Sequence, residues 1–203
     1  MRAVLVVKNG VEINDIEIPE PKSNEVLVKV FACGLNRADL MVADGGVHGA
    51  SGGSGTIVGM EFSGEVVNFG NEVKELSIGD RVMCSGSSAW AEYAITDWGR
   101  VIKIPDNNMD FDTACTYPIA LGTMHNAIIT AGEFTKGQSI LIQGASSGVG
   151  MMGLQIAKYM QAQIIIGTST KTEKHDKLKQ MGADVIFNSK DPSWVDEVLN
   201  LTN

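Results

Sequence analysis

The sequence predicts a mixed fold, in which a β-barrel or sandwich is followed by a parallel sheet built from strand–helix units. Residues 1 to about 115 contain several short strands separated by glycine, serine or aspartate. After residue 112, strands and helices alternate. Residues 141–158 read LIQGASSGVGMMGLQIAK, which is an apolar strand entering a helix through a glycine turn. We therefore expect two domains, over residues 1–120 and 121–203.

Composition is typical of a globular protein and excludes several function classes. Of the 203 residues, 44% are hydrophobic and 20% are charged. The net charge of −8 repels phosphate backbones, so nucleic acid is not an expected partner. No apolar run approaches the roughly twenty residues that cross a bilayer, so no membrane is expected either. The three cysteines, an odd number at wide spacing, are expected to be reduced thiols in a cytoplasmic protein.

The first part of the chain is predicted to be mostly β-structure. The N-terminal apolar stretch is predicted to be an edge strand, because charge returns at Lys8 and Glu12, which is unlike a signal peptide. The glycine-rich segment 45–55 is predicted to be a linker, since no strand leads into it and no helix pattern follows. The other expected extended stretches are 26–30, 56–70, 79–83, 90–95 and 100–105.

The second part is predicted to alternate between strands and helices. A helical region from 112 ends near Gly132. In the helix after the glycine turn, Met152, Ile156 and Tyr159 share one face. Asp191 as N-cap and Pro192 at the first helical position open a last helix that runs through Leu199. The expected strands are 140–143, 164–168 and 185–187, and the expected helices between them are 149–161 and 173–181.

The glycine turn is predicted to bind the diphosphate of a dinucleotide. Helix N-termini offer unpaired N–H groups and the positive end of the helix dipole, and glycines let the phosphates approach the backbone. The usual GxGxxG pattern is not met, because its positions hold Ala145, Ser147 and Gly150. The candidate cofactor residues in the turn are Gly144, Ser146, Ser147, Gly148, Val149 and Gly150.

Two dehydrogenase families have a glycine turn of similar sequence. As GxxxGxG the turn resembles the short-chain dehydrogenases, but 143 residues precede it here, and that family needs a YxxxK pair. Four residues after the three tyrosines stand Asp97, Leu121 and Gln163, so the pair is missing. As GxxSxxG the turn resembles the quinone-reductase branch of the medium-chain dehydrogenases.

The resemblance to the medium-chain dehydrogenases runs through the whole chain. It is carried by EVLVKVFACGLNRADL (25–40), IVGMEFSGEVVNFG (57–70), SIGDRVMC (77–84), AEYAI (91–95) and RVIKIPDN (100–107), followed by the glycine turn. The sequence is similar to the zinc-independent quinone oxidoreductase, or zeta-crystallin-like, branch. This resemblance implies a GroES-like barrel joined to a partial Rossmann domain. It also implies an NADPH-dependent oxidoreductase that delivers hydride to a small-molecule quinone or α,β-unsaturated carbonyl (enone).

No metal site is expected. Zinc alcohol dehydrogenases of this superfamily use cysteine and histidine ligands, but Asn36 and Met60 stand at the first cysteine and the histidine positions. A zinc-type alcohol dehydrogenase therefore remains only a second alternative, with its ligands missing. The resemblance implies that Asn36 is catalytic and bonds the substrate carbonyl or nearby cofactor groups; otherwise it caps the turn before RADL. It also places Thr123 near the nicotinamide; the alternative is that Thr123 is a helix-start hydroxyl.

The cofactor is expected to be NADPH and not NADH. The second strand of the parallel sheet ends without the carboxylate that bonds ribose hydroxyls in NAD sites. Hydroxyls, including that of Ser169, and nearby lysines suit a 2′-phosphate. In the family that the chain resembles, a lysine at the position of Lys174 contacts this phosphate.

The chain ends after its third strand–helix unit, whereas members of that family run well past three hundred residues. We therefore expect a truncated product whose first parallel strand, Ile140–Gln143, is an open apolar edge. A second copy (a homo-oligomer) or another partner is expected to cover this edge. The alternative function is a catalytically impaired nucleotide-binding or dimerisation module.

Overall fold

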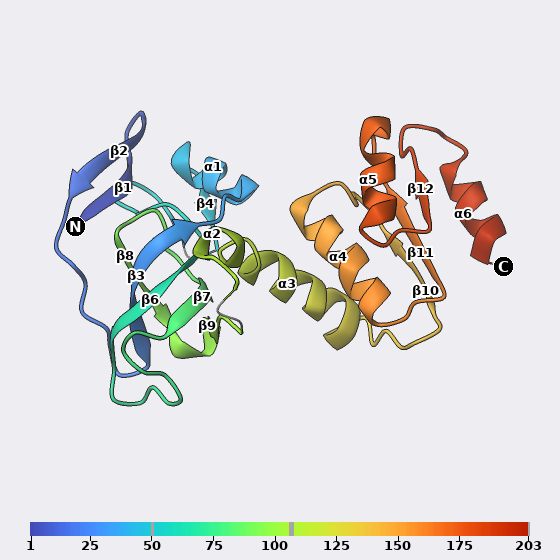
Figure 1. Ribbon diagram of the computed structural model, residues 1–203. Helices are drawn as coiled ribbons and strands as arrows, with labels where there is room; N and C mark the ends of the chain where they lie inside the picture. The colour runs from blue at the N-terminus through green and yellow to red at the C-terminus, as the bar shows by residue number, and fades with distance from the viewer. Residues whose placement is uncertain (50, 106–107, 203) are drawn as a thin grey trace. The chain divides into compact units, whose positions relative to one another are not determined.

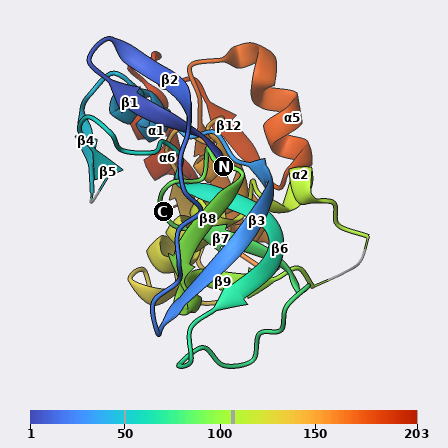
Figure 2. The ribbon, with the colours of Figure 1, turned by 90° about the vertical axis from the view of Figure 1, so that its left-hand side faces the viewer.

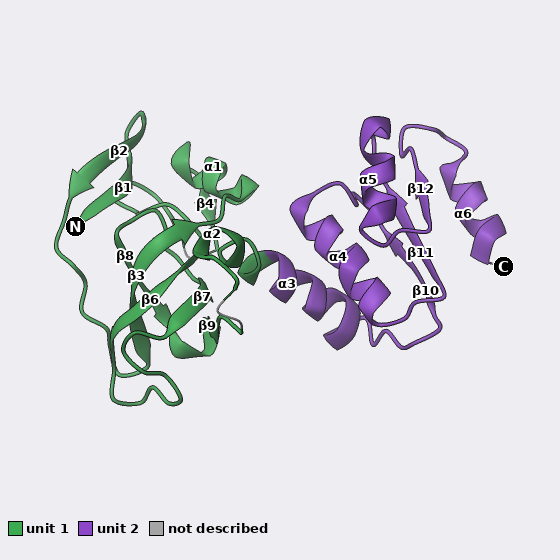
Figure 3. Ribbon diagram, viewed as in Figure 1, with its two compact units in different colours: residues 1–119 green, residues 120–203 purple. Residues whose placement is uncertain are grey.

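A computed structural model describes residues 1–49, 51–105 and 108–202 of the chain. The chain divides into two compact units, residues 1–119 and 120–203 (Figure 3). The predicted boundary after residue 120 lies one residue from this division. The division falls within helix α3 (Pro118–His125), so one helix belongs in part to each unit.

Unit 1 is built on a curled antiparallel sheet of five strands in the order β8-β3-β6-β7-β9 (Figure 2). Its centre is the pair β3 and β6, in which Val28 lies opposite Val66. Valines alternate along β3 because successive strand residues face opposite sides, and Val26 and Val28 are fully buried. The strands are β3 (Glu25–Cys33), β6 (Glu61–Phe69), β7 (Arg81–Ser85), β8 (Tyr93–Asp97) and β9 (Val101–Lys103).

Two small antiparallel ribbons accompany this sheet. The predicted N-terminal edge strand is β1 (Arg2–Val7), which forms a hairpin with β2 (Gly10–Asp15) (Figure 1). Within the segment that was predicted to be a linker, β4 (Val47–His48) pairs with β5 (Ser51–Gly52). The linker interpretation was therefore wrong for these residues. Gly52 has φ +146, and its backbone approaches Val47 so closely that a side chain at residue 52 would collide with it.

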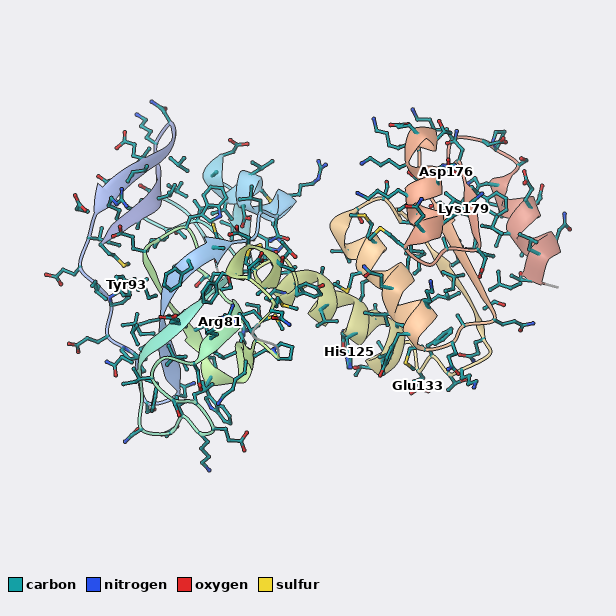
Figure 4. The ribbon with its side chains drawn as sticks, in the orientation of Figure 1. Arg81, Tyr93, His125, Glu133, Asp176 and Lys179 are labelled. Atoms are coloured by element: carbon teal, nitrogen blue, oxygen red, sulfur yellow. The ribbon has the colours of Figure 1, made fainter. Side chains whose placement is uncertain are left out.

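Aromatic rings join the short helix α2 (Phe111–Ala114) to the sheet of unit 1. The rings of Phe31 and Phe111 stack with their centroids 4.9 Å apart. The guanidinium of Arg81, labelled in Figure 4, lies 4.7 Å from the centroid of Phe111. Beneath them, the core of the unit is formed by Val26, Val28, Phe62, Val66, Val82, Cys84, Ala89 and Ala94.

Unit 2 holds a parallel sheet in the order β10-β11-β12, with β10 (Ser139–Ile142), β11 (Ile164–Thr168) and β12 (Val185–Phe187). The structure confirms the predicted fold class, a barrel-like β-unit followed by a partial parallel α/β unit. Within the described residues, β10 pairs only with β11, so it forms one edge of this sheet. Leu141 of β10 is 38% exposed, as expected for an apolar edge.

Helix α4 (Gly148–Tyr159) packs on the sheet of unit 2 through small residues. Its buried positions are Gly150, Gly153, Leu154 and Ala157. The face predicted from Met152, Ile156 and Tyr159 is therefore not the buried one, and Tyr159 is 86% exposed. The face with small residues is the buried one because these residues let the helix axis approach β10 and β11 closely.

The last helix, α6 (Trp194–Thr202), begins later than predicted. Asp191 and Pro192 lie just before its first residue. The Asp191 carboxylate accepts a hydrogen bond from Ser193 N, and the Ser193 hydroxyl donates to Glu197. Asp191 thus accepts from the backbone N–H two residues on, as an N-cap side chain does, although the helix itself begins at Trp194.

The remaining helices complete the two units. None of the described helices is both long and apolar enough to cross a membrane. The three cysteines are free thiols.

The remaining helical elements are α1 (Arg37–Ala43), the 3-10 turns η1 (Trp98–Arg100) and η3 (Thr172–Lys174), the π-helix η2 (Asn126–Thr130) and α5 (His175–Gln180).

Candidate functional site

The glycine turn connects β10 to α4 as the sequence predicts. Gly144 has φ +65, a left-handed conformation that glycine adopts without steric cost. Ser147 is the N-cap of α4, and its hydroxyl accepts a hydrogen bond from Gly150 N at 3.0 Å. A Cβ on Gly150 would lie 2.5 Å from the Gly144 carbonyl oxygen, so only glycine lets the helix start this close to the turn.

The start of α4 leaves hydrogen-bond donors free. Over the described residues, the backbone N–H groups of Gly148 and Val149 donate to no protein atom. A Cβ on Gly148 would meet no atom within 4 Å, so the backbone there is open. Two free N–H groups at the positive end of a helix dipole form a site for an anion such as a phosphate.

The end of β11 lies against this turn. Gly144 N donates to Thr168 Oγ1 at 3.2 Å, and Ala145 N donates to the Thr168 carbonyl at 2.8 Å. The Ser169 hydroxyl donates to Ser146 Oγ at 3.0 Å and accepts from Lys171 N at 3.1 Å. The structure therefore brings Ser146 and Ser169 together. Because the Ser169 hydrogen is used by Ser146, the hydroxyl hydrogen left for a ligand is the one on Ser146.

Two other predicted cofactor residues lie in unit 2 but are not bonded to this turn. Lys174 ends η3 and is exposed. Thr123 is exposed on α3. The next residue along that helix, Met124, contacts α4, because its Cε would lie 2.4 Å from a Cβ on Gly153.

An apolar groove adjoins the glycine turn within unit 2. It encloses about 420 Å³ and runs along the unpaired edge of β10. The sequence analysis did not predict it, because its far wall comes from the π-helix η2 and the residues after it. Its lining includes Met124, Ile128, Phe134, Leu141, Gln143, Ser147 and Val149.

Asn36, the candidate catalytic residue, lies in unit 1 as the N-cap of α1. Its backbone N–H donates to Asp39 Oδ2 at 2.7 Å, and its side-chain Nδ2 donates to Glu61 Oε1 at 2.8 Å. Burial is the main cause that raises the pKa of both carboxyl groups. The sequence analysis missed Glu61, and the available signal was a carboxylate inside the otherwise apolar run MEFSG.

Family comparisons match both units of the chain. Residues 22–106 match the alcohol dehydrogenase GroES-like domain, and residues 148–203 match the family described as zinc-binding dehydrogenase. The two matches occur in the order expected for a barrel followed by a Rossmann-like domain, and together they span well over half of the chain. The chain belongs to the medium-chain dehydrogenase/reductase superfamily.

Relatives within this superfamily include reductases. Human quinone oxidoreductase is 32% identical over 98% of this chain, which spans 61% of that protein. The solved CurK enoyl reductase has a TM-score of 0.87 and 25% identity, over 99% of this chain and 63% of that one. A mycobacterial protein solved in complex with NADPH has a TM-score of 0.84 and 25% identity, over 99% and 63% of the two chains. The chain thus spans less than two thirds of each relative.

The side chains that could bind a metal ion are scattered over the described residues. Among the described residues, no three histidine, cysteine or carboxylate side chains gather so that they could hold a metal ion. Asn36 turns its amide nitrogen, which is a donor and not a metal ligand, toward Glu61. His48 lies on β4 and His175 begins α5, while His125, labelled in Figure 4, ends α3.

Proposed function

We propose that the chain carries the barrel and the nucleotide-binding part of an NADPH-dependent oxidoreductase. The enzyme would reduce a quinone or an α,β-unsaturated carbonyl without zinc. The observation that carries this proposal is the start of α4, where two free N–H groups and the Ser146 hydroxyl surround an open glycine backbone. Three relatives support the proposed function. They are human quinone oxidoreductase, the CurK enoyl reductase and the NADPH-bound mycobacterial protein.

The chain's own residues would bind the cofactor at the turn. Gly148 N, Val149 N and the Ser146 hydroxyl would donate to the diphosphate, and the N-cap Ser147 keeps the helix start in place. Gly144 and Gly150 shape the turn so that the phosphates can approach. The apolar groove beside Val149 would exclude water next to the turn. When bound, NADPH supplies a hydride, and an electron-poor acceptor takes it up without a Lewis acid.

NADPH is favoured over NADH by the groups that follow β11. β11 ends at Thr168, and Ser169 follows it; both are hydroxyl residues, so neither supplies the carboxylate that would bond ribose hydroxyls. Lys174 would pair with the 2′-phosphate. Ser169 would not contact the cofactor itself but would orient the Ser146 hydroxyl by its hydrogen bond.

Replacing Lys174 with alanine is expected to weaken NADPH binding about tenfold or more, because a charge-assisted hydrogen bond to the 2′-phosphate is lost. NADH binding should not change, since NADH has no such phosphate. Isothermal titration with each cofactor measures both constants. Lys179→Ala, on α5 and labelled in Figure 4, is the matched control and should bind both cofactors as the wild type does. Equal losses for NADPH and NADH would contradict the role of Lys174.

A second function is that of a nucleotide-binding module without catalysis, which is favoured by the groove left open along β10. Measuring NADPH binding and NADPH consumption with a simple para-quinone on the same sample separates the two functions. Binding together with consumption supports the reductase. Binding without consumption supports the module.

We also propose that a second copy of the chain, or another partner, covers the open edge of β10. The edge combines unpaired backbone groups with exposed apolar side chains, which favours pairing with another strand. Leu141→Lys is expected to shift the protein to a monomer of 21.6 kDa in light scattering, because a charged side chain opposes strand pairing. Ile78→Lys, at a 71% exposed position of unit 1, should leave the assembly unchanged. A wild-type chain that is monomeric at all concentrations would contradict a second copy at this edge.

A further inference from the structure

A buried carboxylate beside Asn36 has no role in the function proposed above. Glu61 begins β6 and is 4% exposed. Its Oε1 accepts a hydrogen bond from Asn36 Nδ2 at 2.8 Å, and its Oε2 accepts one from Ile119 N at 2.9 Å. The ion pairs that the described residues form do not include Glu61. Two uncharged donors therefore hold this carboxylate inside the unit.

The surrounding backbone leaves room for this carboxylate. A Cβ on Gly34 would lie 2.5 Å from Glu61 Oε1 and 2.7 Å from the Cys115 carbonyl oxygen. Any other residue at position 34 would therefore push the carboxylate away from Asn36. The glycine in ACGLN is thus explained by the position of Glu61.

From this geometry we infer that Glu61 is a positioning residue that fixes the orientation of the Asn36 side chain. The inference rests on the proposed function, in which Asn36 contacts the substrate or the cofactor. A carboxylate can only accept hydrogen bonds, so Asn36 must turn its Nδ2 toward Glu61. What Asn36 keeps for a ligand is then its second Nδ2 hydrogen, because its Oδ1 faces the Asp39 N–H in the capping box of α1.

A second carboxylate fixes the backbone of the same residue. Asp39 is fully buried, and its Oδ2 accepts a hydrogen bond from Asn36 N. Its Oδ1 has no partner among the described residues. Asp39 thus holds the main chain of Asn36, while Glu61 holds its side chain. The capping box of α1 and the bond to Glu61 favour the same orientation of the amide, with Nδ2 toward Glu61.

The link also reaches the start of α3. Ile119 N belongs to the first turn of this helix, and a carboxylate is favourable at a helix N-terminus. One side chain therefore ties together the start of β6, the N-cap of α1 and the first turn of α3. Loss of this tie would free Asn36 to rotate while the strands of the unit stay paired.

The test is the variant Glu61→Gln, whose side chain has one acceptor and one donor. The backbone N–H of Ile119 can only donate a hydrogen bond, so the glutamine oxygen must face it. The glutamine Nε2 then faces Asn36, whose amide must reverse or move away. We expect kcat for quinone reduction to fall about tenfold, with a smaller change in KM for NADPH and with Tm within about 8 °C of the wild type. Glu65→Gln on the same strand is the matched control and should keep the wild-type kcat.

A spectroscopic readout keeps the test independent of turnover. The side-chain NH₂ signals of Asn36, identified by their loss in Asn36→Asp, should shift in Glu61→Gln and stay in place in Glu65→Gln. A folded Glu61→Gln variant with unshifted Asn36 signals overturns the inference. So does a wild-type kcat for this variant when the wild-type enzyme is active. A wild-type chain that binds NADPH but reduces no quinone, while the Asn36 signals still shift, refutes the catalytic part of the proposed function and leaves the positioning by Glu61 standing.

Discussion

Gly150→Ala is expected to destabilise unit 2 by about 3 kcal/mol. The added Cβ would lie 2.5 Å from the Gly144 carbonyl oxygen and 2.7 Å from Ala145 Cα. Both are backbone atoms, which cannot move aside as a flexible side chain can. The turn and α4 must therefore separate, and the packing of Leu154 and Ala157 against the sheet is lost with them.

Differential scanning calorimetry measures this loss. A domain of this size shifts by about 4–8 °C for each kcal/mol, so the transition of unit 2 should move down by at least about 12 °C. Unit 1, whose core is separate, should keep its own stability. A Gly150→Ala variant as stable as the wild type would show that α4 does not start against the turn as described.

Gly148→Ala is expected to keep the stability of the wild type but to weaken NADPH binding at least tenfold. A Cβ at residue 148 meets no atom within 4 Å, and alanine is a better helix former than glycine. The methyl group would, however, stand where the proposed diphosphate approaches Gly148 N and Val149 N. A tenfold loss corresponds to about 1.4 kcal/mol of binding free energy.

The two alanine variants control for each other, since the same methyl group is added two residues apart. Titration of each variant with NADPH, at a temperature where both are folded, gives the comparison. Wild-type NADPH affinity in Gly148→Ala would contradict a diphosphate site at this helix start. A strong loss of stability in the same variant would mean that the backbone there is not open.

The parts of the fold that follow a local pattern could be predicted from the sequence. β11 and β12 have the predicted bounds, because short apolar runs between turn residues leave little choice. The turn at Gly144 was predicted from the glycine spacing, whereas the cap at Ser147 was not predicted. The first residue of a helix is harder to predict: α6 begins at Trp194 and not at Pro192, although Asp191 accepts from Ser193 N.

Non-local contacts limit what the sequence reveals about the site. The bond from Asn36 to Glu61 joins residues 25 apart, and the bond from Ile119 to Glu61 joins residues 58 apart. Neither contact has a periodic or local signature, so Glu61 was missed although Asn36 was predicted. Ser146 and Ser169 were each predicted as cofactor residues, but the bond between them was not predicted, although the carboxyl ends of neighbouring parallel strands meet at one edge of a sheet.

NADPH binding to the wild-type chain tests the central claim most directly. Isothermal titration with NADPH and with NADH, followed by NADPH titration of Gly148→Ala, measures whether the turn before α4 holds a dinucleotide. We predict that the wild type binds NADPH more tightly than NADH, and that Gly148→Ala weakens NADPH binding at least tenfold. A folded wild-type chain that binds neither cofactor, or that prefers NADH, would contradict the account.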